Sequence, residues 1–113
     1  MLKKTNRLTK TKDIDRVFKE GKSFFGRTVG FKIANNDLGS IRINFIVSTK
    51  ISKKAVVRNK IKRQLREIFK AEMQEAITGK DLVVIALPPI IKLVFSEIKL
   101  EIKTSLQKLK LYQ

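Results

Sequence analysis

The stretch AVVRNKIKRQLREIFK, Ala55 to Lys70, combines a regular apolar pattern with six cationic side chains in sixteen residues. At 100° per residue, one side of a helix over this stretch collects the apolar side chains Val57, Ile61, Leu65, Ile68 and Phe69. Most of the cations fall on an adjoining arc, with Asn59 among them. The spacing therefore predicts a helix that is held in a core by one stripe and presents positive charge beside it. We expect this helix to continue through Met73 and to end at Gly79.

Strand patterns flank this helix on both sides. Before it, apolar and polar residues alternate, which predicts two strands over 28–33 and 41–48, joined by turn residues at 35–39, and a shorter strand at 23–25. After it, every residue from 82 to 87 is apolar, and Pro88-Pro89 stops the run. Such an uninterrupted run is typical of a strand that is buried on both faces.

Helical spacing returns near both ends of the chain. Residues 12–20 carry apolar side chains at helical intervals, with Thr9 or Thr11 as the candidate cap, and residues 95–109 do the same with Ser96 as the cap. The order is then helix, three strands, helix, strand, helix. Because no linker or repeat interrupts it, the pattern predicts a single α/β domain of 113 residues.

The composition limits the chemistry that the chain can perform. Lys and Arg number 26 against 10 Asp and Glu, and the net charge of +16 indicates a polyanionic partner, with nucleic acid favoured. Cys and His are both absent, which removes the usual zinc ligands and the Ser-His and Cys-His nucleophiles and agrees with a reducing cytoplasm. The longest apolar run is far below the roughly 20 residues that span a bilayer. We therefore expect a soluble, cytoplasmic chain with no metal, membrane or small-molecule substrate of its own.

Half of the net charge is concentrated around the central helix. Between Lys50 and Lys70 there are nine basic residues and one acidic residue, Glu67. Arg58 and Lys62 form a like-charge pair four residues apart, which costs roughly a few tenths of a kcal/mol and opposes helix stability. Lys and Arg on a rigid helix can instead contact successive phosphates. We interpret this helix as a nucleic-acid-binding element.

Three parts of the chain together resemble the bacterial ribonuclease P protein component. The signature helix of that family is similar to the run Arg58-Asn59-Lys60-Ile61-Lys62-Arg63, continued by Leu65, Arg66 and Phe69. Its amino-terminal segment is similar to Asn6-Arg7-Leu8 with Val17-Phe18-Lys19 and Gly21, and its central strand to Arg42 through Val47-Ser48 and Lys50. The resemblance covers nearly the whole chain.

This resemblance implies a fold and an activity. The fold is an α+β two-layer sandwich of the ribosomal-protein type, with a four-stranded mixed sheet and a left-handed crossover through the signature helix, where the right hand is the general rule. The activity is that of a subunit of an endoribonuclease. In this family the protein binds a catalytic RNA, which uses Mg²⁺ to remove the 5′ leader of precursor tRNA, so the chain needs no catalytic residue of its own. We expect the free chain to be a monomer.

The resemblance also assigns residues to the two RNAs. Contact with the catalytic RNA falls to residues of the signature helix, which are Arg58, Asn59, Lys60, Lys62, Arg63 and Arg66. The charge pattern adds the lysines just before the helix, which are Lys50, Lys53 and Lys54. A cleft between the first helix and the sheet takes the single-stranded leader, and its predicted residues are Arg7, Lys12, Phe18, Lys32, Arg42, Asn44 and Ser48.

Several positions depart from the family pattern. Lys60 replaces an arginine, which turns a bidentate phosphate contact into a point charge. Ile14 and Lys32 stand where aromatic residues are expected, and Ser52-Lys53 replaces a small, glycine-containing turn. Because stacking on an aromatic ring is worth about 1–3 kcal/mol per base, a cleft without those rings should hold the leader more by charge than by stacking.

Two alternatives stay open from the residues alone. One is a ribosomal or other structural RNA-binding protein without an enzymatic role. The other is a DNA-binding protein that places the basic helix in a major groove. The strand patterns at 28–48 and 82–87 argue against the all-helical core that would favour the second alternative.

Overall fold

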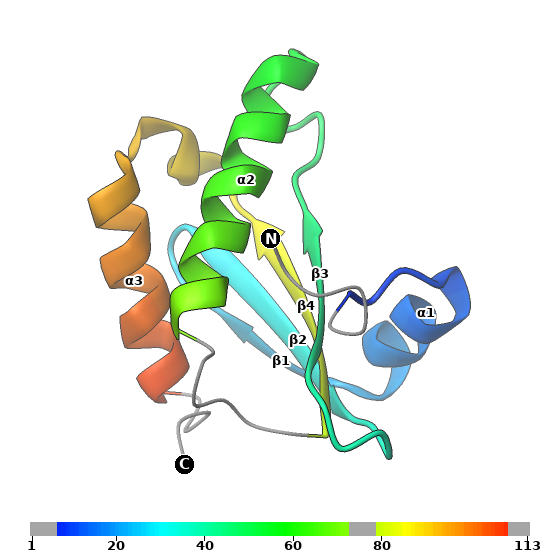
Figure 1. Cartoon of the computed structure of the whole chain (residues 1–113). Helices are drawn as coiled ribbons and strands as arrows, with labels where there is room; N and C mark the ends of the chain where they lie inside the picture. The colour runs from blue at the N-terminus through cyan, green and yellow to red at the C-terminus, as the bar shows by residue number, and fades with distance from the viewer. Residues whose placement is uncertain (1–6, 73–78, 109–113) are drawn as a thin grey trace.

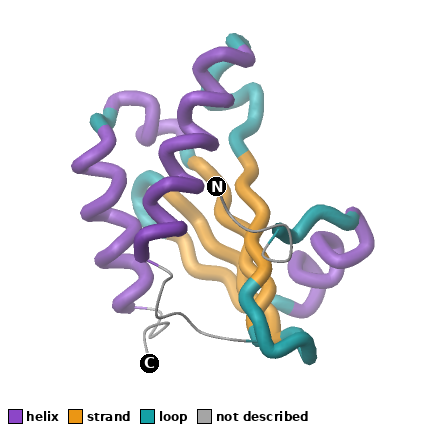
Figure 2. Tube along the Cα trace, viewed as in Figure 1, coloured by secondary structure: helices purple, strands orange, loops and turns teal. Residues whose placement is uncertain are grey.

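The computed structural model describes residues 7–72 and 79–108. They form three α-helices, four strands and a short 3₁₀ helix (Figures 1 and 2). The elements in chain order are α1 Thr11–Glu20, β1 Lys22–Phe25, β2 Val29–Asn35, β3 Arg42–Ile46, α2 Ala55–Glu72, β4 Lys80–Ala86, η2 Pro88–Lys92 and α3 Phe95–Lys108. This order confirms the predicted one, apart from η2, which the sequence patterns did not predict.

The four strands form one mixed sheet in the order β1-β2-β4-β3. Strand β4 lies between β2 and β3, antiparallel to the first and parallel to the second, so β2 and β3 do not pair with each other. Leu82 and Val84 pack in the main core on one face of the sheet and Val83 packs in a smaller core on the other, so all three have no exposed surface, which confirms the predicted buried strand. Helix α2 is the crossover between the parallel strands β3 and β4.

Helices α2 and α3 cover one face of the sheet and enclose the main core (Figure 1). Leu65 and Phe69 of α2 are fully buried there, and the Phe69 ring lies 5.4 Å from the ring of Phe45 in β3 and 6.1 Å from that of Phe31 in β2. The predicted apolar stripe of α2 is therefore the side that meets the sheet. This pair of layers is the sandwich that the resemblance implied.

Helix α1 lies against the opposite face of the sheet (Figure 1). A smaller core there joins Val17 of α1 to Leu8, to Ala34 of β2 and to Val83 of β4. At the end of α1 the chain turns sharply into β1 at Gly21, where a Cβ atom would come within 2.4 Å of the Val17 carbonyl oxygen. Only glycine fits so close to the backbone, so this residue type is required at the turn from α1 into β1.

The predicted cap of α1 is wrong. Lys10 occupies the cap position with an extended backbone, and its side chain makes no cap hydrogen bond, so neither Thr9 nor Thr11 caps the helix. Asp13 in the first turn provides negative charge near the helix amino terminus, which favours the helix dipole without a cap.

The predicted cap of α3 is also wrong. The helix begins at Phe95, so Ser96 lies inside its first turn, and the amide of Val94 donates to Glu97 Oε1 at 3.0 Å. A carboxylate three residues on can satisfy a free amide as a hydroxyl does. The predicted continuation of α2 from Met73 to Gly79 falls on residues 73–78, which lie outside the described part of the chain. No described helix is both long and apolar enough to cross a bilayer.

Candidate nucleic-acid interface

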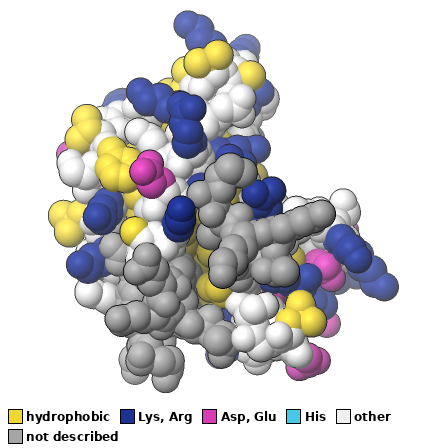
Figure 3. Space-filling model, in the orientation of Figure 1, with side chains coloured by type: hydrophobic (Ala, Val, Ile, Leu, Met, Phe, Trp, Pro, Cys, Tyr) yellow, Lys and Arg dark blue, Asp and Glu magenta, His cyan; other side chains and the backbone are white. Residues whose placement is uncertain are grey.

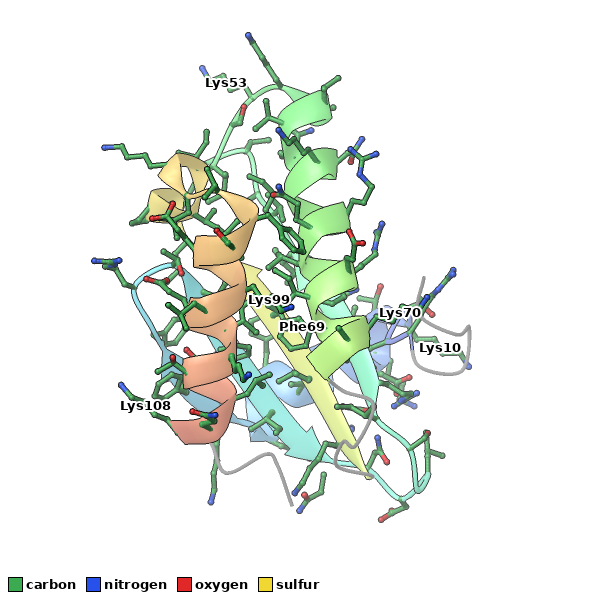
Figure 4. The ribbon with its side chains drawn as sticks, turned by 60° about the vertical axis from the view of Figure 1, so that its left-hand side comes forward. Lys10, Lys53, Phe69, Lys70, Lys99 and Lys108 are labelled. Carbon is green, nitrogen blue, oxygen red and sulfur yellow. The ribbon has the colours of Figure 1, made fainter. Side chains whose placement is uncertain are left out.

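The exposed side of α2 carries the cationic row that its sequence predicts. Ile61, Leu65, Ile68 and Phe69 are buried, whereas Asn59, Lys60, Arg63 and Arg66 are exposed and Lys62 is half-buried. Figure 4 shows Phe69 pointing inward, and Figure 3 shows Lys and Arg side chains along the surface over α2. The predicted helical phase is thereby confirmed for the described residues of α2.

A tight turn before α2 places three more lysines beside this row. The amides of Lys50 and Lys54 donate to the hydroxyl oxygens of Ser48 and Ser52, at 3.3 and 3.1 Å. Such short-range serine contacts fold the backbone without a glycine. Lys50, Lys53 and Lys54 are exposed around the turn.

Arg58 links α2 to this turn. Its Nη1 donates to the Ser52 carbonyl oxygen at 2.9 Å, and the side chain is half-buried. A guanidinium has five N–H donors, so the remaining groups are available to a phosphate. Arg58 therefore has a structural contact that its place in the helix pattern did not indicate.

The cations of α2 have no acidic partners in the described part of the chain. Within residues 7–72 and 79–108, each ion pair involves Arg16, Arg27 or Arg42, all of which lie outside α2 and the turn before it. A row of unpaired like charges on one helix opposes folding unless an anion compensates it. The geometry of this surface therefore fits a polyanion such as the phosphate backbone of RNA.

A second candidate surface lies where α1 meets β1 and β2. The Lys32 ammonium lies 5.3 Å from the ring centre of Phe18 and 5.9 Å from that of Phe25, and it donates to Ser23 Oγ at 2.8 Å. The two rings are 40% and 55% exposed. A cation held between two exposed rings offers both charge and stacking to a single-stranded nucleic acid.

Phe25 is a member of this surface that was not among the predicted residues. It pairs with Gly30 in the β1–β2 register, and a Cβ atom at Gly30 would lie 2.4 Å from the Phe25 ring. The ring therefore occupies the space that a side chain at Gly30 would fill. Alternation in Phe24-Phe25 contains the signal, because only one ring can join the core: Phe24 lies 6.4 Å from Phe31, and Phe25 must face outward.

Arg42, predicted to contact the leader, is held by two carboxylates. Its Nε and Nη2 donate to Asp81 at 2.8 and 2.7 Å, and its Nη1 donates to Asp13 at 3.3 Å. Asp81 is fully buried, and it also accepts hydrogen bonds from Arg16 of α1 at 2.6 Å and from Asn36 at 2.7 Å. Burial by itself raises the pKa of Asp81, but the hydrogen bonds from Arg42, Asn36 and Arg16 outweigh it and hold that pKa below its usual range.

No pattern in the sequence predicts this ion-pair network. Its signal was a single carboxylate, Asp81, at the start of a strand that is otherwise apolar. A buried carboxylate needs partners, yet the sequence does not say which of the 26 cations supplies them. The network joins α1 to the sheet, so Arg42 helps to hold α1, which carries Phe18, in place.

The other predicted leader residues lie at several different places. Asn44 Nδ2 donates to the Leu8 carbonyl oxygen at 2.9 Å and so fixes the N-terminal segment against β3. Arg7 pairs with Ile43 in a parallel bridge at the same edge. Lys12 is exposed on α1, and Ser48 belongs to the turn before α2. Of the predicted set, Phe18 and Lys32 are in direct contact with each other.

The described residues offer no protein-held metal site. No group of three or more His, Cys, Asp or Glu side chains comes together within residues 7–72 and 79–108. The buried carboxylate of Asp81 is already occupied by arginines.

Comparisons with known proteins agree on one family. The Ribonuclease P family model matches residues 2–110. The ribonuclease P protein component of Bacillus pumilus is 36% identical over 113 residues, which are 99% of this chain and 94% of that protein. The corresponding protein of Geobacillus thermodenitrificans is 35% identical over 108 residues, or 95% of this chain and 88% of that one.

Solved structures give the same result. The RNase P protein of Staphylococcus aureus superposes with a TM-score of 0.88 at 33% identity, covering 96% of this chain and 98% of that one. The RNase P protein of Thermotoga maritima gives a TM-score of 0.81 at 29% identity, covering 90% and 96%. These matches favour the enzyme-subunit interpretation over a ribosomal or DNA-binding role. The chain therefore belongs to the family of bacterial ribonuclease P protein components, which are subunits of the RNA-based endoribonuclease that removes the 5′ leader from precursor tRNA.

Proposed function

We propose that this chain binds the two RNAs of the reaction on two separate surfaces. The catalytic RNA contacts α2 and the turn before it, through Lys50, Lys53, Lys54, Arg58, Asn59, Lys60, Lys62, Arg63 and Arg66. The 5′ leader of precursor tRNA contacts the surface formed by Phe18, Phe25 and Lys32, with further contacts from Arg7, Lys12, Arg42, Asn44 and Ser48. The row of unpaired cations on a helix anchored in the core is the observation that carries this proposal.

Contact with the catalytic RNA rests on the rigidity of α2. Leu65 and Phe69 fix the helix on the sheet, so Arg63 and Arg66 are presented at fixed positions before any RNA binds. Binding then releases counterions from the RNA without first ordering the helix. Lys60 contributes charge without the directional fork of an arginine.

Contact with the leader rests on the exposed rings and the cation between them. Phe18 and Phe25 provide two faces on which unpaired bases stack, and Lys32 provides the charge for a phosphate between them. Phe25 supplies an aromatic side chain that the family pattern places elsewhere in the cleft. The leader is therefore held by stacking as well as by charge, in contrast to the expectation from Ile14 and Lys32 alone.

The protein positions the RNAs and leaves the chemistry to the catalytic RNA. We place the Mg²⁺ of the reaction at the RNA active site, as membership of this family implies. We further infer that the free chain is monomeric and works in the cytoplasm, where precursor tRNA is made. Its role is to raise the affinity for precursor tRNA by holding the leader beside the catalytic RNA.

Two sets of variants test the proposal. Arg63→Ala with Arg66→Ala should weaken binding to the catalytic RNA by about tenfold or more. Phe18→Ala with Phe25→Ala should leave that affinity unchanged and remove the preference of the holoenzyme for precursor tRNA over a substrate without a leader. Lys103→Ala with Lys108→Ala is the matched control, since both lysines are exposed on α3.

The measurements are the dissociation constant for the catalytic RNA and the dissociation constants of the reconstituted holoenzyme for substrates with and without a leader. Equal loss of RNA affinity in the α2 and α3 double variants would show non-specific electrostatics instead of a defined surface. An unchanged leader preference after removal of both rings would rule out the second surface.

A further inference from the structure

We infer that a groove between the N-terminal segment and α2, at the edge of β3, binds one unpaired nucleotide of RNA. This inference rests on the proposed function and gives it a third contact. The groove has a volume of about 260 Å³. It is lined by the N-terminal segment, β3 and α2, through Arg7, Leu8, Thr9, Ile43, Asn44, Phe45, Lys62 and Arg66.

One wall of the groove is built by main-chain pairing. The Leu8 amide donates to the Ile43 carbonyl oxygen at 2.9 Å, and Asn44 Nδ2 donates to the Leu8 carbonyl oxygen at 2.9 Å. The segment therefore runs beside β3 and carries Arg7 and Thr9 along the edge of the sheet. This wall is fixed to the sheet, so the groove exists before a ligand enters.

The opposite wall is cationic. Lys62 and Arg66 lie one helical turn apart on α2, and both line the groove. Neither forms an ion pair within the described part of the chain, and no carboxylate lines the groove. Two like charges facing one hollow favour an anion there, and a phosphodiester is the anion that an RNA-binding surface meets.

The floor of the groove suits a base. Ile43 and Phe45 contribute apolar surface between the two polar walls. Asn44 uses its amide hydrogens on Leu8, and among the described residues no donor reaches its Oδ1, which can accept a hydrogen bond from a base edge. The cationic rim therefore suits the phosphate of a nucleotide, and the apolar floor suits its planar base.

The size of the groove favours a small occupant. Its 260 Å³ lies below the roughly 300–1,000 Å³ of pockets that hold drug-sized ligands. A single unpaired nucleotide is therefore a better match for this hollow than a base pair. The source of that nucleotide is either a bulge or loop of the catalytic RNA or the leader itself, and the crosslinking described below distinguishes the two.

The first test measures binding of uridine 5′-monophosphate to the free protein by NMR. Saturable shifts are expected at the amides of Leu8, Thr9 and Asn44. Lys62→Gln with Arg66→Gln should weaken the binding by about tenfold or more. Lys70→Gln, an exposed cation one turn further along α2, should change it less than twofold.

Two outcomes of this titration would overturn the inference. Inorganic phosphate producing the same shifts at the same concentration would mean that the groove holds an anion only. An equal loss in Lys70→Gln would mean that the whole helix attracts the nucleotide. The dissociation constants of the wild type and of Arg63→Ala for the catalytic RNA show independently whether the proposed α2 interface holds, because Arg63 does not line the groove.

The second test locates the nucleotide in the holoenzyme. Because the chain contains no cysteine, Thr9→Cys gives a single attachment site for a photocrosslinker at the groove, and Lys103→Cys on α3 gives the control. Crosslinks from position 9 to unpaired nucleotides of the catalytic RNA, or to the leader, support the inference and identify the source. Crosslinks confined to paired regions, or no more frequent than those from position 103, overturn it.

Discussion

Arg42 of β3 and Asp81 of β4 are register partners in the parallel pair, and two hydrogen bonds of 2.8 and 2.7 Å join the guanidinium to the carboxylate. Arg16 of α1 donates to the same carboxylate at 2.6 Å, and Asn36 does so at 2.7 Å. One fully buried charge thus connects α1, the turn after β2 and the two parallel strands. The proposed leader surface depends on it, since α1 carries Phe18.

Asp81→Asn should destabilise the protein strongly. The substitution keeps the size of the side chain but leaves the guanidinium groups of Arg42 and Arg16 without their shared counterion, and breaking a buried pair typically costs about 3–5 kcal/mol. Urea unfolding followed by circular dichroism measures the loss. Asp15→Asn, on the exposed side of α1, is the control and should stay within about 0.5 kcal/mol of the wild type. Similar losses in both variants would contradict a special role for the network.

The same carboxylate should make stability depend on acid pH. The pKa of Asp81 is lower in the folded chain than the value of about 3.9 for an unfolded aspartate, so its contribution is fully present above that value. It is lost as the pH falls through the lowered pKa. The free energy of unfolding should therefore fall more steeply below about pH 4 in the wild type than in Asp81→Asn. Parallel curves for the two proteins would show that another group controls the acid transition.

The sequence predicted α2 well because its apolar spacing and its charge pattern indicate the same orientation of the helix. Its apolar period places Leu65 and Phe69 in the core, and its charges can lie only on the remaining side. The ion-pair network was not predictable in the same way, since Asp81 and Arg16 are 65 residues apart and meet only when the sheet forms. Periodicity describes which side of an element is buried, and it contains no information on which polar groups meet there.

The second surface shows the same limit. Phe18 and Lys32 were placed in the leader cleft by resemblance, and the structure brings them together. Phe25 was missed because alternation in the four residues of β1 places Phe24 and Phe25 on opposite faces without showing which of the two rings joins the core. The pairing of Phe25 with Gly30 fixes which face of the sheet carries the Phe25 ring, and that register exists only in the folded sheet.

Gly30→Ala should weaken leader binding indirectly, by displacing the Phe25 ring and not by removing a contact with the RNA. A Cβ atom there would lie 2.4 Å from the Phe25 ring, so the ring must move off the strand. We expect leader-dependent affinity to fall by about 1–3 kcal/mol, the value of one stacked base. The affinity for the catalytic RNA should not change. The double variant Gly30→Ala/Phe25→Ala should be no worse than Phe25→Ala alone; additive losses would mean that Gly30 acts by another route.

Arg58→Ala and Arg63→Ala should differ in stability although both remove one charge from α2. Arg58 donates to the Ser52 carbonyl oxygen, so its loss should cost roughly 1 kcal/mol and loosen the turn before α2. Arg63 is exposed with no such contact, and its removal should leave the free energy of unfolding nearly unchanged. Leu65→Ala, from the buried stripe, should lower the free energy of unfolding by about 2–5 kcal/mol. It serves as the reference for the loss of a core side chain. Urea unfolding ranks the three variants, and a loss in Arg63→Ala that matches Leu65→Ala would contradict the helical phase.

The salt dependence of binding should report the number of phosphates that α2 and its preceding turn contact. If about six phosphates are neutralised on duplex-like RNA, the logarithm of the binding constant should fall as the logarithm of the salt concentration rises. The expected slope is about −5. Arg63→Ala should reduce the magnitude of that slope by about one, because one fewer counterion is released. Lys103→Ala on α3 should leave it unchanged, since that lysine lies outside the proposed surface. Titrations in potassium chloride at fixed Mg²⁺ measure all three slopes, and a wild-type slope near zero would exclude phosphate contact as the basis of binding.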